Sequence, residues 1–546
     1  MVHYLIAYLS AEIGLYSELH TYSGGLGVLA GDHLKSAADE GMEMVAVTLL
    51  YRRGYGRQHL DSEGNQTETY PDLDPRRHLK DTGLEMTLPL DGKMLTIRIW
   101  MAKIVGRNGH EVPVYFLDSR HDENHISHIG LSDTLYGGDD RMRIRQEFLL
   151  GVGGIRALEK LGHWPLKGLH LNEGHCSFAA LEMLERGWSK SEVSKKTLFT
   201  THTPVPAGHD KFDWKLVEEV AKELIDEDDR ILANENGLFS MSHLGIGLAG
   251  SVNAVSGLNA EVASKMFPNS NIMPITNGVH HPSWISPSMA SLYERELPGW
   301  RSDGSILENA AILSETGIER ARTEARSVLR EIVKSMTGVE LDGNRLTIGF
   351  ARRFATYKRA SLIFRDIERL NSIASGEIQF VFSGKAHPKD EGGKELIKDI
   401  FRSSRNLDDI PLAFLEDYSM ATGLAITSGV DVWLNTPVRP MEASGTSGMK
   451  AVLNGVPNLS ILDGWWPEAC KHGINGWAIG NDHEERDDER DANSLYRVLE
   501  LDVLPSWKDN RKVWVAMMKE AIKAGAGFTG QRMIRQYSEI YDKFDI

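Results

Sequence analysis

Cysteine is scarce in this 546-residue sequence, and long apolar runs and an excess of basic charge are missing from it. Its two cysteines, Cys176 and Cys470, are too few for a disulfide framework and indicate a reducing compartment, so we expect a cytoplasmic protein. No apolar run reaches the roughly 18 residues of a membrane span, so we expect no membrane partner. Lysine and arginine total 61 against 77 aspartate and glutamate, a formal charge of −16 that disfavours nucleic acid as a partner.

The predicted succession of elements is typical of an α/β protein. At about 150 residues per domain, the length predicts two to four domains. The apolar N-terminal stretch lacks the basic region of a signal peptide and predicts a buried strand. In the second half, apolar patterns predict a strand at 346–350, a helix at 360–375 and further strands at 378–383, 411–416 and 431–435. Such alternation predicts a parallel, doubly wound sheet, with ligands at the carboxyl ends of its strands.

The stretch with the most chemical information runs from Glu442 to Lys450 and reads EASGTSGMK. Small residues let a ligand approach the backbone closely, and amides ahead of a helix bind anions. A lysine on the first helical turn, packed among small residues, loses its proton more easily and can attack a carbonyl. These properties suit pyridoxal phosphate (PLP), which brings an aldehyde and a phosphate. The alternative is a Gly/Ser loop with a surface lysine.

Four cations follow the predicted strand at 346–350, namely Arg352, Arg353, Lys358 and Arg359. Arginine offers a bidentate fork and lysine a point charge, a combination that suits phosphate. In an acidic protein, cations gathered at one strand end indicate an anionic ligand. The alternative is a solvated basic loop.

Two features of the first half also predict ligand contacts. The glycine-rich loop at 22–31 opens a predicted helix and suits an anion or a sugar phosphate, whereas its spacing does not match the dinucleotide fingerprint. His202 follows a predicted strand at 197–201, where it faces a ligand or caps a turn. Metal binding by His175, His202 and His209 is disfavoured because the spacing of zinc enzymes is missing, so we expect no metal.

Several motifs together resemble those of the α-glucan phosphorylases, the glycogen, starch and maltodextrin phosphorylases. The stretch 442–450 is similar to their PLP-lysine motif, E-A-S-G-T-x-x-M-K. Gly-Gly-Leu-Gly at 24–27 resembles their glycine loop, 276–278 resembles T-N-G-I, and 352–359 resembles K-R-x-H-E-Y-K-R. The motifs follow the order of the family from residue 22 to about 466, which is most of the chain. We expect the short form of the family, without the additional regulatory N-terminal region.

The resemblance implies a fold and a division into domains. The fold would be of the GT-B glycosyltransferase type, with two Rossmann-like α/β domains that face a central cleft. Residues 1–278 would form the N-terminal domain, with the glycine loop and glucan-side residues. Residues 279–546 would form the C-terminal domain with the PLP lysine. Packing of the last helix on the N-terminal domain and assembly into a homo-oligomer are both left open.

The resemblance also assigns residues to PLP. Lys450 would hold the cofactor covalently through a Schiff base, and Tyr418 would lie near it. The remaining contacts, to the PLP phosphate, would come from Arg352, Thr446 and Ser447.

Further residues would bind the substrates, an α-1,4-glucan and inorganic phosphate. Arg353 and Lys358 would bind the substrate phosphate, and Gly25 would present its backbone amide to the phosphates. The residues expected to hold the glucosyl unit are His202, Asn277, Tyr357, Glu442, Ser444 and Gly445. Lys450, Arg353, Lys358 and His202 would form the catalytic set.

The implied reaction is reversible phosphorolysis that yields α-glucose 1-phosphate with retention, in which the PLP phosphate serves as a proton relay. Glu442 would bind sugar and would not act as a nucleophile, because no carboxylate pair of the glycosidase type is needed. The alternatives are a glucan synthase that uses a nucleotide sugar and a non-catalytic glucan-binding homologue. Neither would need Arg353, Lys358 and Lys450 together.

The sequence departs from the family pattern at three places. One is the stretch 201–206, which reads THTPVP where the family has N-H-T-V-L-P. Ala355 and Thr356 replace the histidine and acid of K-R-x-H-E-Y-K-R, and Ser419 stands where larger members carry an arginine for the PLP phosphate. The effect of these changes on phosphate affinity is left open.

Overall fold

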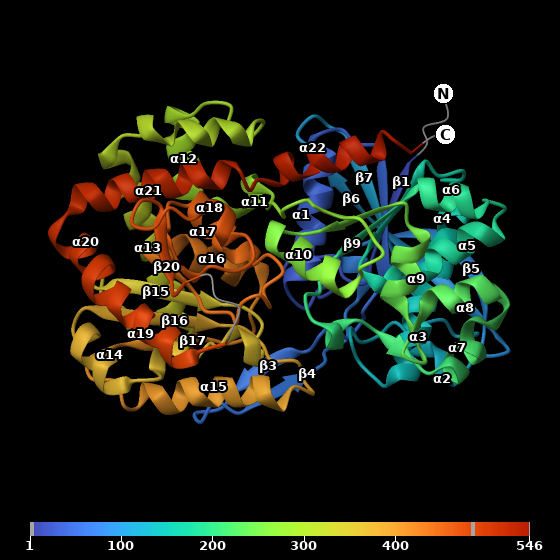
Figure 1. The fold of residues 1–546 in the computed structure, drawn as a ribbon, viewed down its shortest axis with the longest axis horizontal. Coiled ribbons are helices and arrows are strands. Elements are labelled where there is room, and N and C mark those ends of the chain that lie inside the picture. Colours follow the sequence, from blue (N-terminus) through green and yellow to red (C-terminus); the bar gives the residue numbers. More distant parts are fainter. Residues whose placement is uncertain (1–4, 482–485, 545–546) are drawn as a thin grey trace. The chain divides into compact units, whose positions relative to one another are not determined.

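The computed structural model describes residues 5–481 and 486–544, which form two compact units (Figure 1). The first unit comprises Met1–Gly56, Tyr70–Thr276 and Met533–Ile546, and the second comprises Arg57–Thr69 and Asn277–Arg532. A single boundary after residue 278 would place Arg57–Thr69 and Met533–Ile546 in the opposite units. Each unit is therefore made of separate stretches of the chain, whereas the sequence predicted two continuous domains.

In the described part of the chain, the first unit holds a nine-stranded sheet of order β14-β13-β9-β8-β1-β2-β7-β6-β5. Its strands are β1 Ile6–Ser10, β2 Met44–Leu49, β5 Lys80–Leu90, β6 Lys93–Val105, β7 Glu111–Asp118, β8 Gly168–Asn172, β9 Thr197–Thr201, β13 Ser251–Ala254 and β14 Ile272–Pro274. Pairing is parallel from β14 to β7 and antiparallel from β7 to β5. A small second sheet contains β10 Lys211–Phe212, β11 Asn234–Glu235 and β12 Leu238–Ser240.

The helices of the first unit are α1 Gly25–Asp39, α2 Ile126–Ile129, α3 Asp140–Phe148, α4 Gly154–Lys160, α5 Phe178–Glu185, α6 Lys190–Lys195, α7 Trp214–Ala221, α8 Glu227–Ala233, α9 Met241–Leu248 and α10 Gly257–Met266, with α22 Gly530–Tyr541 at the end of the chain. They cover both faces of the large sheet. Tyr8 of β1 packs in one apolar cluster with residues of α1 and α22. Its neighbour Leu9 packs in another cluster, with residues of α3, α4, α5 and α9. Successive strand residues point to opposite faces, so this arrangement is doubly wound.

Among the residues described in the second unit, six parallel strands have the order β17-β16-β15-β18-β19-β20. They are β15 Leu346–Ala351, β16 Ile378–Ser383, β17 Leu412–Leu415, β18 Val432–Asn435, β19 Asn458–Ile461 and β20 Gly476–Ile479. Counted within this unit, the order is 3-2-1-4-5-6, the order of dinucleotide-binding α/β folds. The strand order reverses between β15 and β18, where such sheets bind ligands.

The helices of the second unit are α11 His281–Trp284, α12 Pro287–Glu296, α13 Glu315–Thr337, α14 Ile367–Ala374, α15 Glu391–Ser404, α16 Met420–Gly429, α17 Thr446–Leu453, α18 Trp466–Ala469, α19 Asp488–Val498, α20 Leu504–Asp509 and α21 Arg511–Ala526. Val381 of β16 packs with residues of α13, α16 and α17 on one face of the sheet. On the opposite face, the ring of Phe380 lies 5.9 Å from that of Phe364. The second sheet is therefore also covered on both faces, and the prediction of parallel α/β sheets is confirmed.

The helix predicted at 360–375 is wrong in its first half. Arg359 adopts a left-handed conformation with φ of 47°, and α14 begins at Ile367. Asp366 caps α14 by accepting a hydrogen bond from the backbone N–H of Arg369. The turn before α14 directs the Arg359 guanidinium to the carbonyls of Thr436 and Pro437. A tertiary contact therefore overrides the local helical pattern.

The hairpin of β3 Arg57–Leu60 and β4 Gln66–Thr69 packs on the second unit. The Gln58 side chain donates to the carbonyl of Gly384 at 2.9 Å and accepts from the N–H of Asp417 at 2.9 Å. The Gln66 side chain pairs with both backbone groups of Ala386 at 3.0 Å. The hairpin thereby fixes the loops that follow β16 and β17.

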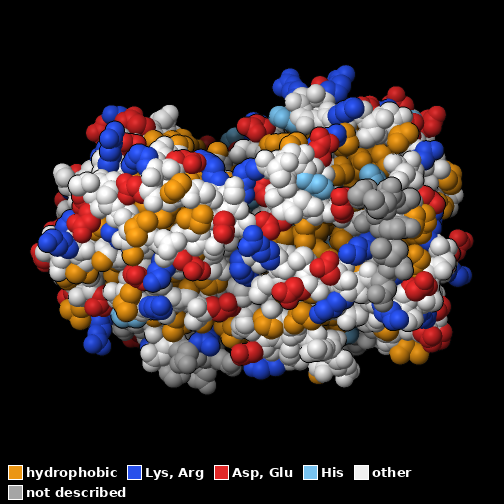
Figure 2. Space-filling model, turned by 90° about the horizontal axis from the view of Figure 1, so that it is seen from above, with side chains coloured by type: hydrophobic (Ala, Val, Ile, Leu, Met, Phe, Trp, Pro, Cys, Tyr) orange, Lys and Arg blue, Asp and Glu red, His pale blue; other side chains and the backbone are white. Residues whose placement is uncertain are grey.

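Over residues 5–481 and 486–544, no helix is long and apolar enough to cross a membrane. On the face shown in Figure 2, acidic and basic side chains are interspersed with apolar ones.

Candidate functional site at the strand ends

The strand ends beside the reversal of the second sheet carry most of the predicted site residues. Arg352 and Arg353 follow β15 directly, and the loop after β18 leads to Glu442 and then to α17. Because parallel strands end at one edge of a sheet, residues about 90 positions apart along the chain meet here.

Glu442 is the centre of this cluster. Its carboxylate accepts hydrogen bonds from Lys358 Nζ at 2.9 and 2.8 Å and is also paired with the Arg352 guanidinium. Burial alone would raise the pKa of Glu442, but the charges of Arg352 and Lys358 outweigh it and lower the pKa to about 2. Glu442 is therefore ionised at neutral pH, and it holds two cations in place.

Glu442→Gln is expected to lower the free energy of unfolding by about 3 kcal/mol at pH 7, because two buried cations lose their partner. The pKa of Glu442 is depressed from 4.5 to about 2. The stabilisation is thus complete above pH 4.5 and is lost as the pH falls through about 2. Urea unfolding at pH 7, 5, 4 and 3 gives the free energy of unfolding of wild type and variant. The difference between the two free energies should become smaller below pH 5. A difference that stays constant down to pH 3 would contradict this assignment.

Asp463 holds the same loop and was not predicted. This fully buried carboxylate accepts the backbone N–H of Glu442 at 2.9 Å and that of Gly464 at 2.8 Å. Burial and then the charge of Glu442 raise the pKa of Asp463 to about 7. The signal in the sequence was an aspartate just after a short apolar stretch, but its partner lies 21 residues away.

Glycines allow close packing around the lysine helix. Gly445 precedes α17 with φ of 82°, a conformation that favours glycine. A Cβ on Gly464 would lie 2.3 Å from the carbonyl oxygen of Ser444, so no other residue fits there without movement. The N–H of Trp465 donates to the same carbonyl at 2.9 Å. The loop 442–445 is therefore fixed against the segment that follows β19.

Lys450 lies on α17 with an exposed fraction of 4%. Its Nζ lies 3.5 Å from the centroid of the Trp284 ring. The sequence analysis did not select Trp284, because a tryptophan 166 positions from the lysine carries no local signal. The surface-lysine alternative is therefore wrong.

Two buried polar atoms near Lys450 and Glu442, in the sequence or in the cluster, make no hydrogen bond to the part of the chain that the structure describes. Ser444 Oγ and Arg352 Nε are inaccessible to solvent and lack a hydrogen-bond partner among the described atoms. Leaving buried polar atoms unpaired costs free energy, so these two atoms are candidates for contacts with a ligand. A hydroxyl, a guanidinium and a lysine amine suit an aldehyde-bearing phosphate, so the donor set fits PLP.

The other predicted residues of the second unit are distributed as follows. Tyr357 lies against Lys358, whose Nζ is 4.5 Å from the ring centroid. Burial would raise the pKa of Tyr357, but Lys358 and the nearby arginines lower it overall. Thr446 and Ser447 are half-buried on the first turn of α17, and Arg353 is exposed.

Asn277 and Tyr418 complete the set in this unit. Asn277 is buried, and its Oδ1 lacks a hydrogen-bond partner in the described part of the chain. Tyr418 is half-buried and packs against the apolar cluster of α13, α16 and α17. Next to it, Ser419 caps α16 by accepting the N–H of Thr422 at 3.2 Å. The departure at Ser419 thus serves the helix.

In the first unit, His202 follows β9 and is held by residues that follow β8. Its Nε2 pairs with Asn172 Oδ1 at 2.7 Å, and its backbone N–H donates to Glu173 Oε2 at 2.8 Å. Burial lowers the pKa of His202 to about 4, so the imidazole is neutral at physiological pH. Gly25 is the first residue of α1, with open space where its Cβ would lie.

The histidines considered as metal ligands have different surroundings. His209 Nδ1 pairs with Ser242 at 2.7 Å. His175 lies with Glu147 and Asp210, and their ligand atoms are within 4.8 Å of one another. The guanidinium of Arg143 binds Asp210 at the same place. The positive charge of Arg143 therefore already lies at the place that a metal ion bound by Glu147, His175 and Asp210 would take.

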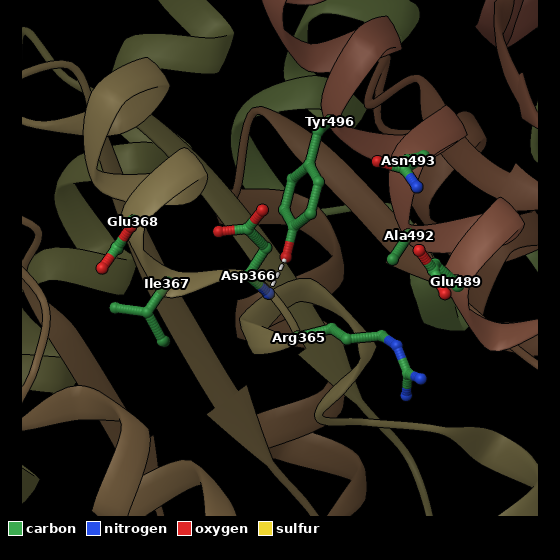
Figure 3. A pocket seen from close by; sticks show the side chains of 8 residues that line it. All are labelled: Arg365, Asp366, Ile367, Glu368, Glu489, Ala492, Asn493 and Tyr496. Atoms are coloured by element: carbon green, nitrogen blue, oxygen red, sulfur yellow. Dashed lines mark hydrogen bonds between the residues drawn. The ribbon is translucent and has the colours of Figure 1, made fainter.

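A shallow pocket of about 390 Å³ opens elsewhere in the second unit, between α14 and α19 (Figure 3). Figure 3 shows the N–H of Asp366 donating to the Tyr496 hydroxyl, a contact of 2.8 Å. The residues that line it are Arg365, Asp366, Ile367, Glu368, Glu489, Ala492, Asn493 and Tyr496. None of the predicted site residues is among them.

The fold and the site define an α/β protein with cationic side chains gathered at the carboxyl ends of its strands. Its sequence matches the carbohydrate phosphorylase family over residues 182–472. It is 40% identical to the maltodextrin phosphorylase of Thermococcus litoralis, over 99% of this chain and 70% of the relative. The glycogen phosphorylase of Mycobacterium tuberculosis is 40% identical, over 98% and 70% of the two chains. The glycogen phosphorylase of Aquifex aeolicus is 36% identical, over 98% of this chain and 86% of the relative. The chain belongs to the carbohydrate phosphorylase family and is a glycosyltransferase, as its motifs predicted.

Proposed function

We propose that this enzyme is an α-1,4-glucan phosphorylase that requires PLP. Phosphate would displace the shortened glucan from C1 of the terminal glucosyl unit. The C1–O4 bond breaks, a C1–O–P bond forms with retention, and O4 receives a proton. The observation that supports this proposal best is the buried Glu442, paired with Arg352 and Lys358 on the strand edge that also carries Lys450. The cluster has more positive than negative charge and therefore favours phosphate.

Lys450 would bind PLP, with the unpartnered Ser444 hydroxyl and the unpartnered Nε of Arg352 available to it and to the substrates. Thr446 and Ser447 would meet its phosphate at the start of α17, and Tyr418 would lie nearby. When bound, PLP supplies a phosphate group that exchanges a proton with the substrate phosphate.

Arg353 and Lys358 would bind the substrate phosphate. Phosphate competes with Glu442 for Lys358, so its arrival would release the Glu442 carboxylate to accept a sugar hydroxyl. Tyr357, Asn277, Ser444 and Gly445 would supply further contacts to the sugar. The cations would also stabilise the charge that the phosphate carries in the transition state.

His202 and Gly25 would contribute from the first unit. A neutral imidazole donates or accepts a hydrogen bond without repelling the positive charge that develops on the glucosyl ring. The Gly25 amide, at the start of α1, would donate to phosphate. Participation of both units in one reaction, as in GT-B enzymes, is part of this proposal. Both cysteines are free thiols, which supports a reducing compartment, the cytoplasm.

The decisive experiment is an assay of the PLP-loaded protein with maltoheptaose and inorganic phosphate. ³¹P NMR should show α-glucose 1-phosphate, formed only when glucan, phosphate and PLP are all present. The same protein should not extend maltoheptaose with a nucleotide glucose. Glucan extension from the nucleotide sugar without phosphorolysis would favour the synthase alternative and refute the proposal.

A further inference from the structure

Asn454 joins two parts of the second unit that meet at the cofactor lysine. It follows α17, which ends at Leu453, and its side chain is fully buried. Its Nδ2 donates to the carbonyl of Lys450 at 2.9 Å and to that of Trp284 at 2.7 Å. Its Oδ1 accepts the N–H of Ser286 at 2.8 Å. One amide therefore binds the backbone of both the lysine and the tryptophan.

These bonds act where the helix has no partners of its own. The last carbonyls of an α-helix lack intrahelical donors, and a short helix such as α17 depends on outside groups. Tyr293 donates to the carbonyl of Leu453 at 2.8 Å, and Asn454 supplies the bond to Lys450. The four-residue helix α11 ends at Trp284, and Asn454 holds the backbone on both sides of its end.

We infer that Asn454 is a positioning residue that sets the Trp284 ring against the amine of Lys450. The ring centroid and Nζ are 3.5 Å apart, so a small shift of either backbone would break the contact. The aromatic face fixes where the amine points, and the amine is the group that must meet the cofactor aldehyde. The assignment of PLP to Lys450 rests on the proposed function, whereas the contact with Trp284 does not.

The test compares Asn454→Ala and Asn454→Asp with wild type. Aspartate keeps the acceptor for Ser286 but loses both donated bonds, so both variants should bind PLP at least tenfold more weakly. The absorbance band of bound PLP, followed as PLP is added to the apoprotein, gives the affinity. An Asn454→Asp variant with wild-type affinity and an unchanged band would overturn the inference.

Asn124 of the first unit offers a matched control. It donates to the carbonyls of Thr96 and Ser119, each at 2.7 Å, and accepts the N–H of Thr96 at 2.7 Å. Asn124→Ala thus removes the same kinds of bond within the other unit and should leave the PLP affinity unchanged. Unfolding of both Asn454 variants beside a folded Asn124→Ala protein would indicate a structural role and overturn the positioning role.

A cofactor-free measurement separates this inference from the proposed function. The difference in fluorescence between wild-type apoprotein and the Trp284→Leu variant gives the contribution of Trp284. Lys450→Met should change that contribution when Asn454 is present and leave it unchanged in Asn454→Asp, because the contact is already lost. Equal changes in both backgrounds would overturn the inference. Failure of wild type to take up PLP would refute the proposed function, and the fluorescence result would still stand.

Discussion

Lys450→Ala is expected to abolish retention of PLP and to reduce phosphorolysis by at least about 10³-fold. The reason is that loss of the lysine anchor also removes PLP from the site, so only the contacts that bind the substrates are left. The purified variant should lack the absorbance band of bound PLP. In wild type, borohydride should reduce the Schiff base, change this band and leave the cofactor attached to the protein after denaturation.

Lys450→Arg provides the control for charge. It keeps a buried cation over Trp284 but cannot bond to an aldehyde, so it should retain the wild-type unfolding midpoint and still lose the band. A Lys450→Ala protein that keeps both its band and its activity would remove the basis for placing PLP on α17.

Arg353→Ala is expected to lower kcat/KM for phosphate by about 10²- to 10³-fold, the usual effect of removing one donor to a developing charge. Arg353 is exposed, so the free energy of unfolding should change little. Initial rates at varied phosphate and fixed glucan measure the effect. Arg353→Lys should recover part of the activity, because a point charge replaces a bidentate fork.

Arg77→Ala is the matched control, since Arg77 is an exposed arginine of the first unit. It should leave the phosphate dependence unchanged. If Arg353→Ala raises KM for the glucan and not for phosphate, Arg353 binds sugar, and the proposed allocation of roles within the cationic cluster is wrong.

The opposing pKa values of two neighbouring carboxyl groups show how the site is built. Glu442 has a pKa of about 2 because Arg352 and Lys358 face it, whereas that of Asp463 is about 7 because it is buried beside Glu442. One acid balances the charges of Arg352 and Lys358, and the other binds the backbone of the loop. Both roles depend on surroundings, and neither could be assigned from residue type.

The sequence by itself determined the parallel α/β class, the strand ends that carry the candidate site residues, and the family. Strand and helix patterns are local, so buried strands such as β15 and β16 were found close to their observed bounds. The motif at 442–450 is also local: its glycines, hydroxyls and lysine act within one loop and one helical turn. The segment it selected carries the buried Lys450 and the ion-paired Glu442.

Tertiary structure alone decided which distant residues complete the site. Trp284 lies against Lys450, and Asp463 binds the backbone of Glu442 from 21 positions away, so their spacing along the chain follows no period. Asn454 is close to Lys450 in the sequence, but its bonds to Trp284 and Ser286 span 170 and 168 positions. The hairpin Arg57–Thr69 joined the second unit because Gln58 and Gln66 pair with backbone groups more than 300 positions away. Such contacts depend on how sheets and loops close in space, which local propensity does not encode.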